Sequence, residues 1–419
     1  MINSIQNERK KRMRKPIKLL HLFQILSMAL VIIYNVEYFN KPSIIVAVLL
    51  ILMTLISNLL ISKITSGDNY ILYIANMMFS IGIVMITRLE FSLGISQLKL
   101  YGIGIVAFFL VYLFLKKTIV FWKDKTLFYF IVCVLMFLAT LLLGTDLYGA
   151  RNWISILGHS IQLSEFTKIP LVMLVASFYY RYDEFSKKKF GKLYLNIAIY
   201  IFIGFFFLQR ELGTALVFFV ILVCSQIAYE KNKKIVIANI LLASIGAVLA
   251  YFLFAHIRVR FEIWIDPWSS INDKGYQITQ SLFAIASGGF FGTGVGLGNP
   301  NYIPLGYSDF IFAAICEEMG IFMGICLVLL FLILFYRGMK ISIGKNDIFY
   351  SSLALAISVL FAAQSLIMFL GVLKLIPLTG ITIPFVSHGG SSLISSFILL
   401  AILQICSEDT DKLEGKYEG

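Results

Sequence analysis

Hydrophobic positions along the chain gather into long continuous runs separated by short polar segments. A helix needs about 20 apolar residues to cross the ~30 Å hydrocarbon layer of a membrane, and runs of about this length recur along most of the sequence. We therefore expect an all-α polytopic membrane protein with about twelve transmembrane helices, or as few as ten if neighbouring runs form one broken helix. The expected spans lie near residues 17–39, 42–62, 70–89, 98–115, 125–145, 164–182, 192–208, 212–229, 233–257, 311–337, 348–372 and 384–406.

Lysine and arginine are concentrated in every second segment between these expected helices. With the N-terminus inside, the inner segments carry basic clusters such as those within 9–15 and 187–192, whereas the outer segments carry few basic residues. Because positively charged short loops stay on the cytoplasmic side, we expect both termini in the cytoplasm. The chain would then comprise a basic cytoplasmic N-terminus (1–16), a single transmembrane domain (17–406) and a cytoplasmic tail (407–419).

Composition excludes several classes of protein. Hydrophobic residues make up 59% of the 419 residues and charged residues only 14%. Soluble domains carry about 25% charged residues, so a soluble multi-domain protein is excluded. The net charge of +12 reflects cationic cytoplasmic loops, and we expect no nucleic-acid partner. The five cysteines form no CxxC pair and no Cys/His cluster, which indicates neither a disulfide framework nor a zinc site.

Two expected outer segments are longer than a connection requires. One covers 144–163, and the other is a large extracytoplasmic loop at about 258–310 that contains glycine, proline, tyrosine and charged residues. Long loops without regular structure are usually functional. We expect these two to meet a substrate at the outer membrane surface.

The first outer segment and the helix after it contain four candidate residues. Arg151 and Trp153 lie at the expected outer surface, and the planar fork of an arginine matches phosphate oxygens. Glu165 and Lys168 stand three residues apart near the outer start of a helix, hence on one face. They are either a self-neutralising pair that fixes helix packing or part of a cavity wall facing an anionic substrate, and both roles can hold.

The second outer segment contains a glycine run and leads to a single carboxylate. The run at 288–298 is either a phosphate-cradling nest or a re-entrant turn that needs positive φ. Asp309 directly precedes an apolar helix, where it either caps the helix or acts as a general base opposite basic residues. A polar, glycine-rich stretch at 377–392 also lies at a membrane edge, where irregular backbone is tolerated only inside protein or along a cavity.

Seven short blocks of the chain form a recognisable series. They are Gly149 to Ile154, Gln162 to Lys168, Gln209 to Ala215, Asp266-Pro267, Gly275 to Gln277 with Gln280-Ser281, Ser308 to Ala313 with Glu317-Glu318, and Thr379 to Ser392. In this order they resemble the SEDS family (shape, elongation, division and sporulation), the FtsW/RodA/SpoVE proteins. The resemblance implies an inverting peptidoglycan glycosyltransferase that polymerises lipid II into glycan strands at the outer face of the bacterial cytoplasmic membrane. It also implies a complex with a class B penicillin-binding protein, a transpeptidase.

The resemblance also implies residue roles. Asp309 falls on the presumed catalytic acid of the family, and the family's Arg-Trp and Glu-x-x-Lys positions fall on Arg151, Trp153, Glu165 and Lys168. Several positions depart from the family pattern, which leaves open whether the chain serves division, elongation or sporulation. The departures are Leu163 for proline, Arg210-Glu211 for Pro-Asp, Leu305 and Tyr307 for the Glu and His before the catalytic acid, and His388 for tyrosine.

We hypothesise that Asp309 takes the proton from an acceptor hydroxyl while positive charge stabilises the departing pyrophosphate of an undecaprenyl-linked glycan. A divalent cation (Mg²⁺ or Mn²⁺) held with the help of the substrate is chemically reasonable, whereas no dedicated metal cage and no organic cofactor are expected. The expected substrate-binding residues are Arg151, Trp153, Glu165, Lys168, Arg210, Arg258, Arg260, Tyr276, Gln277, Gln280, Ser387 and Ser391.

Three other functions remain open at this point. A flippase for a lipid-linked cell-wall precursor would use the same charges without covalent chemistry. A non-catalytic scaffold would hold a penicillin-binding protein in the membrane. A secondary transporter would show internal repeats and ionisable groups near the membrane midplane, whereas the notable groups of this chain cluster near its expected outer surface.

Overall fold

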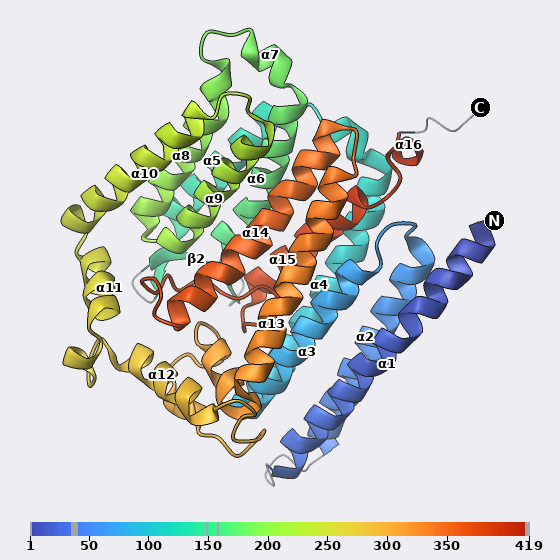
Figure 1. Ribbon diagram of the computed structural model, residues 1–419, viewed down its shortest axis with the longest axis vertical. Helices are drawn as coiled ribbons and strands as arrows, with labels where there is room; N and C mark the ends of the chain where they lie inside the picture. Colours follow the sequence, from blue (N-terminus) through green and yellow to red (C-terminus); the bar gives the residue numbers. More distant parts are fainter. Residues whose placement is uncertain (1, 35–40, 148–149, 157–158, 415–419) are drawn as a thin grey trace.

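The computed structural model describes residues 2–34, 41–147, 150–156 and 159–414, and these form a tilted bundle of long helices (Figure 1). The long helices occupy the apolar runs of the sequence, because a helix satisfies its own backbone hydrogen bonds within hydrocarbon. Their bounds are α1 (Ile2–Tyr34), α2 (Lys41–Ile64), α3 (Tyr70–Leu89), α4 (Phe91–Thr118), α5 (Thr126–Leu143), α6 (Leu163–Tyr180), α8 (Tyr194–Gln209), α9 (Leu212–Tyr229), α10 (Lys234–Leu253), α13 (Ile311–Ile343), α14 (Ile348–Val372) and α15 (Gly390–Cys406).

The expected fold class is confirmed as helical and membrane-embedded. Within the described residues, ten helices are long and apolar enough to cross a membrane. The other two expected spans correspond to α6, which carries Glu165 and Lys168, and to α15, which is apolar but has only 17 residues. Both pack inside the bundle against each other and against α14. The count of twelve spans therefore stays a prediction.

The helices divide into a buried centre and a periphery. Almost every residue of α3 and α14 is buried, whereas α1, α2, α5 and α10 expose rows of leucine and isoleucine. Exposed aliphatic rows would be costly in water but suit a lipid-facing surface. The centre of the bundle is formed where α14 packs on α6, α9 and α13 and where α4 packs on α15.

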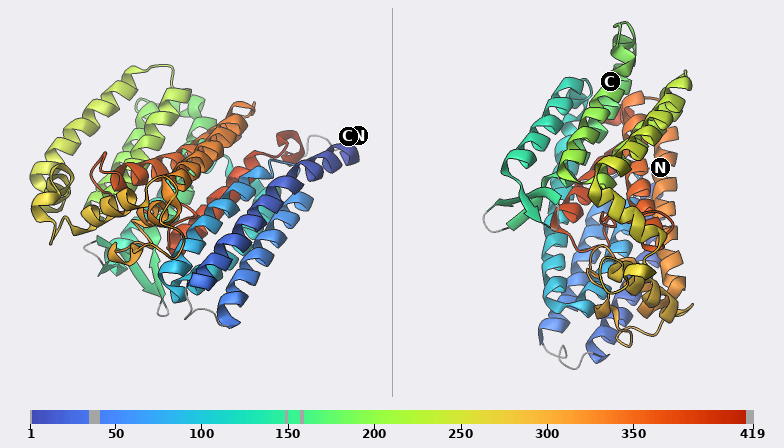
Figure 2. Two further views of the ribbon diagram at one scale, coloured as in Figure 1. Left: turned by 60° about the horizontal axis from the view of Figure 1, so that its bottom comes forward. Right: turned by 90° about the vertical axis from the view of Figure 1, so that its left-hand side faces the viewer.

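The two ends of the bundle differ in what they carry. The start of α1 and the short helices α7 (Tyr182–Ser186) and α16 (Thr410–Leu413) lie at one end, and the small sheet with α11 (Ala255–Ile265) and α12 (Tyr276–Gly288) lies at the other (Figures 1 and 2). The chain passes back and forth between these two ends, as the alternating distribution of basic residues predicts. We call the end with α7 and α16 the inner end and the opposite one the outer end.

The outer segments contain regular structure that the sequence pattern did not predict. Residues 145–162 form an antiparallel sheet in the order β1-β2-β3, with β1 (Thr145–Leu147), β2 (Ala150–Ile156) and β3 (His159–Gln162). This short sheet is an addition to the helical fold class, which is confirmed for the chain as a whole. Its strands pair only with their sequence neighbours, and this pairing satisfies backbone groups that would otherwise be exposed.

The large outer loop is likewise more ordered than expected. Helices α11 and α12 occupy much of it, and two short 3-10 turns lie at Trp268–Ser270 and Pro300–Tyr302. Helix α10 ends at Leu253, and α11 begins at Ala255 after one intervening residue. Helix α11 then turns the chain along the outer end (Figure 1). Two further 3-10 turns, Ile119–Trp122 and Gly191–Leu193, lie at the inner end.

The start of the expected cytoplasmic tail is packed against the inner end. The Glu408 side chain is buried and accepts hydrogen bonds from the Thr65, Ser66 and Tyr112 side chains and from the Ser66 amide at 3.1 Å. Burial by itself would raise the pKa of Glu408, but these hydrogen bonds and the charge of Lys116 outweigh it and hold the pKa below its ordinary value. Glu408 therefore joins the end of α15 to the α2–α3 connection.

We expect Glu408→Ala to destabilise the protein by about 2 kcal/mol or more, because buried donors lose a charged acceptor. The measurement is the apparent melting temperature in detergent. Since the folded-state pKa is depressed, the stabilisation by Glu408 is present above its unfolded-state pKa and is lost as the pH falls through the folded-state value. Glu184→Ala is a matched control, because Glu184 is exposed on α7, and it should leave the melting temperature unchanged. Equal effects of the two substitutions would contradict this role of Glu408.

Candidate active site

Asp309 lies in the tight turn that leads into α13. The turn is formed by the amides of Ser308 and Phe310, which both donate to the Leu305 carbonyl at 3.0 and 3.2 Å, with Leu305 itself in the left-handed region at φ 54°. The Asp309 side chain is half-buried there. It accepts no backbone amide of the first turn of α13 in the manner of a helix cap, which leaves it for another role.

The segment between α14 and α15 fixes this turn from the other side. Ser387 donates its hydroxyl to the Ser308 carbonyl at 2.8 Å and accepts the Ile383 amide at 2.9 Å. The adjacent His388 amide donates to the Tyr307 carbonyl at 2.9 Å. Ser387, an expected substrate-binding residue, is buried, and in the structure it positions the backbone that carries Asp309.

Arg260 of α11 approaches the same place. Its Nη1 donates to the carbonyls of Leu378 and Thr379 at 3.0 and 2.9 Å. A Cβ built on Gly380 would lie 3.6 Å from Asp309 Oδ2 and 3.9 Å from Arg260 Nη2. The carboxylate and the guanidinium therefore both approach the Cβ position of this exposed glycine, whose φ of +70° favours glycine.

Helix α11 is anchored to the α14–α15 segment at a second point. The Trp264 indole donates to the Lys374 carbonyl at 3.1 Å, and the Lys374 ammonium donates back to the Ile265 carbonyl at 3.3 Å. Together with the two bonds from Arg260, these contacts fix α11 along the segment that contains Gly380. The orientation of Arg260 therefore follows from backbone contacts and needs no ligand.

The surroundings of Asp309 change its acidity. Burial raises the pKa of Asp309 to about 6, while the hydrogen bond with Ser308 and the positive charge of Arg260 oppose this shift. A carboxylate with a pKa near 6 is ionised at neutral pH yet is a stronger base than an ordinary aspartate. Perturbed carboxylates with a specific charged neighbour are candidates for functional sites.

Glu165 and Lys168 form a closed pair inside the bundle. Lys168 Nζ lies 2.8 Å from Glu165 Oε2 and 2.9 Å from Gln364 Oε1, and Ser395 donates to Glu165 at 3.3 Å. The exposed fractions of Glu165 and Lys168 are 4% and 2%. These contacts join α6 to α14 and α15. They fit the packing role, which is one of the two roles that the sequence left open, and the role in substrate binding stays a prediction.

Glu211, between α8 and α9, connects the small sheet to the bundle. It accepts hydrogen bonds from Asn152 at 3.1 Å, Ser164 at 3.0 Å and Thr214 at 2.6 Å, and from the Gln162 amide group at 3.3 Å. Burial raises the pKa of Glu211, and three of these hydrogen bonds oppose the shift. Sequence reasoning missed this residue, although it stands where the chain departs from the Pro-Asp-Leu-Gly pattern.

The glycine run does not form a phosphate nest. Its amides are used by the start of α13: Gly296 donates to Glu318 Oε2 at 3.0 Å and Asn299 donates to Glu317 Oε1 at 2.7 Å. Thr293 and Gly294 donate to the backbone carbonyls of the same two glutamates. The run wraps around a kink in α13 at Gly320, so the re-entrant turn is the interpretation that the structure supports.

The remaining expected site residues are spread over the outer end. Arg210 and Arg258 are exposed, and Arg258 Nη2 donates to the Phe252 carbonyl at 3.0 Å. Buried Ser391 accepts the Gln162 amide at 2.9 Å and thus fastens β3 to α15. The backbone of Arg151 lies in β2, but its side chain falls outside the described residues. The residues that are half-buried on β2 and α12 are Trp153, Tyr276, Gln277 and Gln280.

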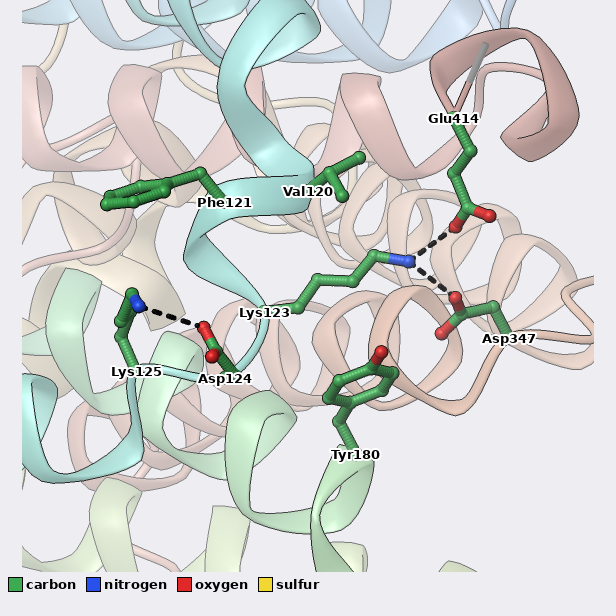
Figure 3. A pocket seen from close by; sticks show the side chains of 8 residues that line it. All are labelled: Val120, Phe121, Lys123, Asp124, Lys125, Tyr180, Asp347 and Glu414. Atoms are coloured by element: carbon green, nitrogen blue, oxygen red, sulfur yellow. Dashed lines mark hydrogen bonds and ion pairs between the residues drawn. The ribbon is translucent and has the colours of Figure 1, made fainter. Parts of the chain in front are cut away.

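A pocket of about 600 Å³ lies at the inner end (Figure 3). There Lys123 Nζ lies 2.5 Å from carboxylate oxygens of both Asp347 and Glu414 and 4.5 Å from the centre of the Tyr350 ring. None of the expected site residues lines this pocket. Its paired lysine joins the α4–α5 connection to the start of α14 and to the C-terminal segment.

Comparisons with known proteins agree with the fold and the motifs. Residues 68–412 match the model of the FtsW/RodA/SpoVE family, described as cell cycle protein. The chain is 35% identical over 366 residues to "Peptidoglycan glycosyltransferase RodA" of Mycobacterium tuberculosis, with 80% of this chain and 77% of that protein covered. It is 30% identical over 361 residues to "Stage V sporulation protein E" of Bacillus subtilis, with 82% and 97% covered.

Two solved structures share the fold at low sequence identity. The first, described as "Structural coordination of polymerization and crosslinking by a peptidoglycan synthase complex", has a TM-score of 0.71 at 19% identity and covers 84% of this chain and 99% of its own. The second, the rod shape determining protein RodA of Thermus thermophilus, has a TM-score of 0.60 at 18% identity, with 85% and 100% covered. The sequence blocks, the helical fold and the family match together show that the chain belongs to the FtsW/RodA/SpoVE family.

Proposed function

We propose that this chain is a peptidoglycan glycosyltransferase that polymerises lipid II at the outer face of the bacterial cytoplasmic membrane, with Asp309 as the general base. One observation carries the assignment of the base: the Asp309 carboxylate and the backbone-anchored Arg260 guanidinium both approach the Cβ position of Gly380 at the outer end of the bundle. Burial, which raises the pKa of Asp309 to about 6, supports it. Relatives named as peptidoglycan glycosyltransferases support the reaction class. They do not favour a flippase or a scaffold.

The chemistry is a displacement at the anomeric carbon of the donor sugar. The 4-hydroxyl oxygen of the acceptor forms the new bond to that carbon, and its proton goes to the Asp309 carboxylate. The bond from the carbon to the diphosphate oxygen breaks, and the electron pair leaves with the diphosphate. A base is needed on the acceptor side, and positive charge is needed where negative charge develops on the leaving group.

A partner and a cation belong to the same proposal. The neighbour described as a complex that coordinates polymerization and crosslinking supports a class B penicillin-binding protein as partner of this chain. A divalent cation would be held by Asp309 together with the diphosphate, because Mg²⁺ prefers carboxylate and phosphate oxygens. Among the described residues, no group of three or more His, Cys, Asp or Glu residues could hold a metal ion by itself.

We expect Asp309→Asn to lower the rate of lipid II polymerisation by about 10²–10⁴-fold, which is the usual contribution of a general base. The measurement is the formation of glycan ladders by the purified protein, with and without candidate transpeptidases. Lys274→Ala is the control, since Lys274 is exposed on the outer surface away from Gly380. Polymerisation by Asp309→Asn at the wild-type rate would exclude Asp309 as the base.

The acidity of Asp309 predicts the pH dependence of the wild-type enzyme. Activity should rise as the pH increases through about 6 and level off above it, because the ionised carboxylate is the active form. Since Arg260 lowers the pKa of Asp309, Arg260→Met should move this rise to higher pH. The measurement is the pH profile of kcat/KM for the residual activity. A shift of the Arg260→Met profile toward lower pH, or no shift, would contradict the proposed pairing.

The cation is tested by removing it. A chelator should abolish polymerisation by the wild-type protein, and Mg²⁺ or Mn²⁺ should restore it. The melting temperature should stay unchanged throughout, because the cation would be held only together with substrate. Full activity in the presence of chelator would show that the reaction proceeds without a divalent cation.

A further inference from the structure

A histidine that the proposed reaction does not yet use lies next to Arg260. His256 is four residues before Arg260 on α11, so the two side chains share a face of the helix. The ring of Phe254, two residues earlier, packs on His256 and also stacks on Phe207 near the end of α8, with centroids 5.7 Å apart in both cases. This packing holds the start of α11 against the end of α8.

The turn after α8 brings a second arginine to this histidine. Arg210 ends α8 in the left-handed conformation, at φ 60°. Close packing at the start of α9 fixes the turn: a Cβ on Gly213 would lie 2.4 Å from Ile381 Cγ2 and 3.3 Å from the Thr379 carbonyl oxygen. The α8–α9 turn, α11 and the segment around Gly380 therefore converge.

Two polar atoms at this convergence have no partner. Within the described residues, His256 Nε2 and Thr379 Oγ1 are both buried and neither makes a hydrogen bond. Thr379 is the residue whose carbonyl is bound by Arg260 Nη1. Buried polar atoms are nearly always satisfied, so two orphans on residues next to one fixed arginine indicate a place where a polar ligand completes the bonding.

The charges at this place favour an anion. His256 shares its helix face with Arg260 and is affected by the charge of Arg210 on the neighbouring turn, and Asp309 is the acidic group near Gly380. Burial and the charges of these two arginines lower the pKa of His256, so its ring is neutral until negative charge arrives. An anion between the three groups would offset the arginine charges and favour the protonated ring, which donates from both nitrogens.

We propose that His256 and Thr379, together with Arg210 and Arg260, bind the diphosphate of a prenyl-linked glycan, with His256 Nε2 and Thr379 Oγ1 donating to its oxygens. This inference rests on the proposed function, which supplies a diphosphate leaving group. It adds His256 and Thr379 to the site and places the leaving group beside α11 and Thr379. A diphosphate suits this cluster because it offers several charged oxygens to donors from different elements.

The test measures binding of a probe that cannot be polymerised. Farnesyl diphosphate is titrated into the full chain in detergent, and binding is followed by intrinsic tryptophan fluorescence. We expect His256→Phe, which keeps an aromatic ring but loses the donor, to weaken binding by about tenfold or more. His256→Gln keeps an N–H at similar reach and should lose less. Lys274→Ala removes an exposed charge elsewhere on the outer surface and should bind as wild type does.

Further arms separate the sources of the anion and guard against misfolding. Farnesol binding should be the same in wild type and His256→Phe, because the alcohol has no charge for the cluster. Phosphatidylglycerol should compete weakly; if His256→Phe weakens its binding as strongly as that of farnesyl diphosphate, the site is a general phospholipid site and the proposal fails. Thr379→Val keeps the side-chain shape and should also weaken diphosphate binding, which keeps the test decisive if His256→Phe does not fold.

The outcome is separable from that of the proposed function. Unchanged farnesyl diphosphate affinity in both His256→Phe and Thr379→Val, in a protein whose polymerisation depends on Asp309, would overturn only the diphosphate site. Loss of affinity in these variants of a protein that polymerises nothing would support the site and refute the reaction.

Discussion

Inside a membrane every buried polar group must find its partner within the protein, and this constraint arranges the outer end of the chain. Glu317 and Glu318 accept the amides of the glycine run with their carboxylates and carbonyls. Glu211 accepts hydrogen bonds from four side chains on four elements, β2, β3, α6 and α9. A small set of charged groups around Gly380 takes no part in these bonds. Arg260 is held there by backbone carbonyls, and Asp309 faces it without forming a helix cap.

The sequence predicted the helices well because long apolar runs have one stable form in hydrocarbon. It singled out Asp309 as a carboxylate before an outer helix start, left its role as cap or base open, and took the catalytic role from the family resemblance; that role stays a prediction. It could not predict the sheet at 145–162, whose strands are three to seven residues long. Nor could it pair Arg260 with Gly380, because that contact joins α11 to a segment more than a hundred residues away.

Several expected substrate residues also make contacts within the scaffold, and their contact with substrate stays a prediction. Ser387 holds the Asp309 turn, Ser391 fastens β3, and Glu165 with Lys168 joins three helices. Residue type and spacing cannot distinguish a polar group that contacts substrate from one that positions such a group. The distinction needs the partner atoms, and here those partners are mostly backbone carbonyls and neighbouring side chains.

The account as a whole places a base and a set of cationic and neutral donors around Gly380. The most direct measurement is a structure of the full chain with a prenyl diphosphate bound. The account predicts phosphate density beside Gly380, within hydrogen-bond reach of Arg260 and Thr379. Phosphate bound instead at Glu165 and Lys168, or at the inner-end pocket around Lys123, would contradict it.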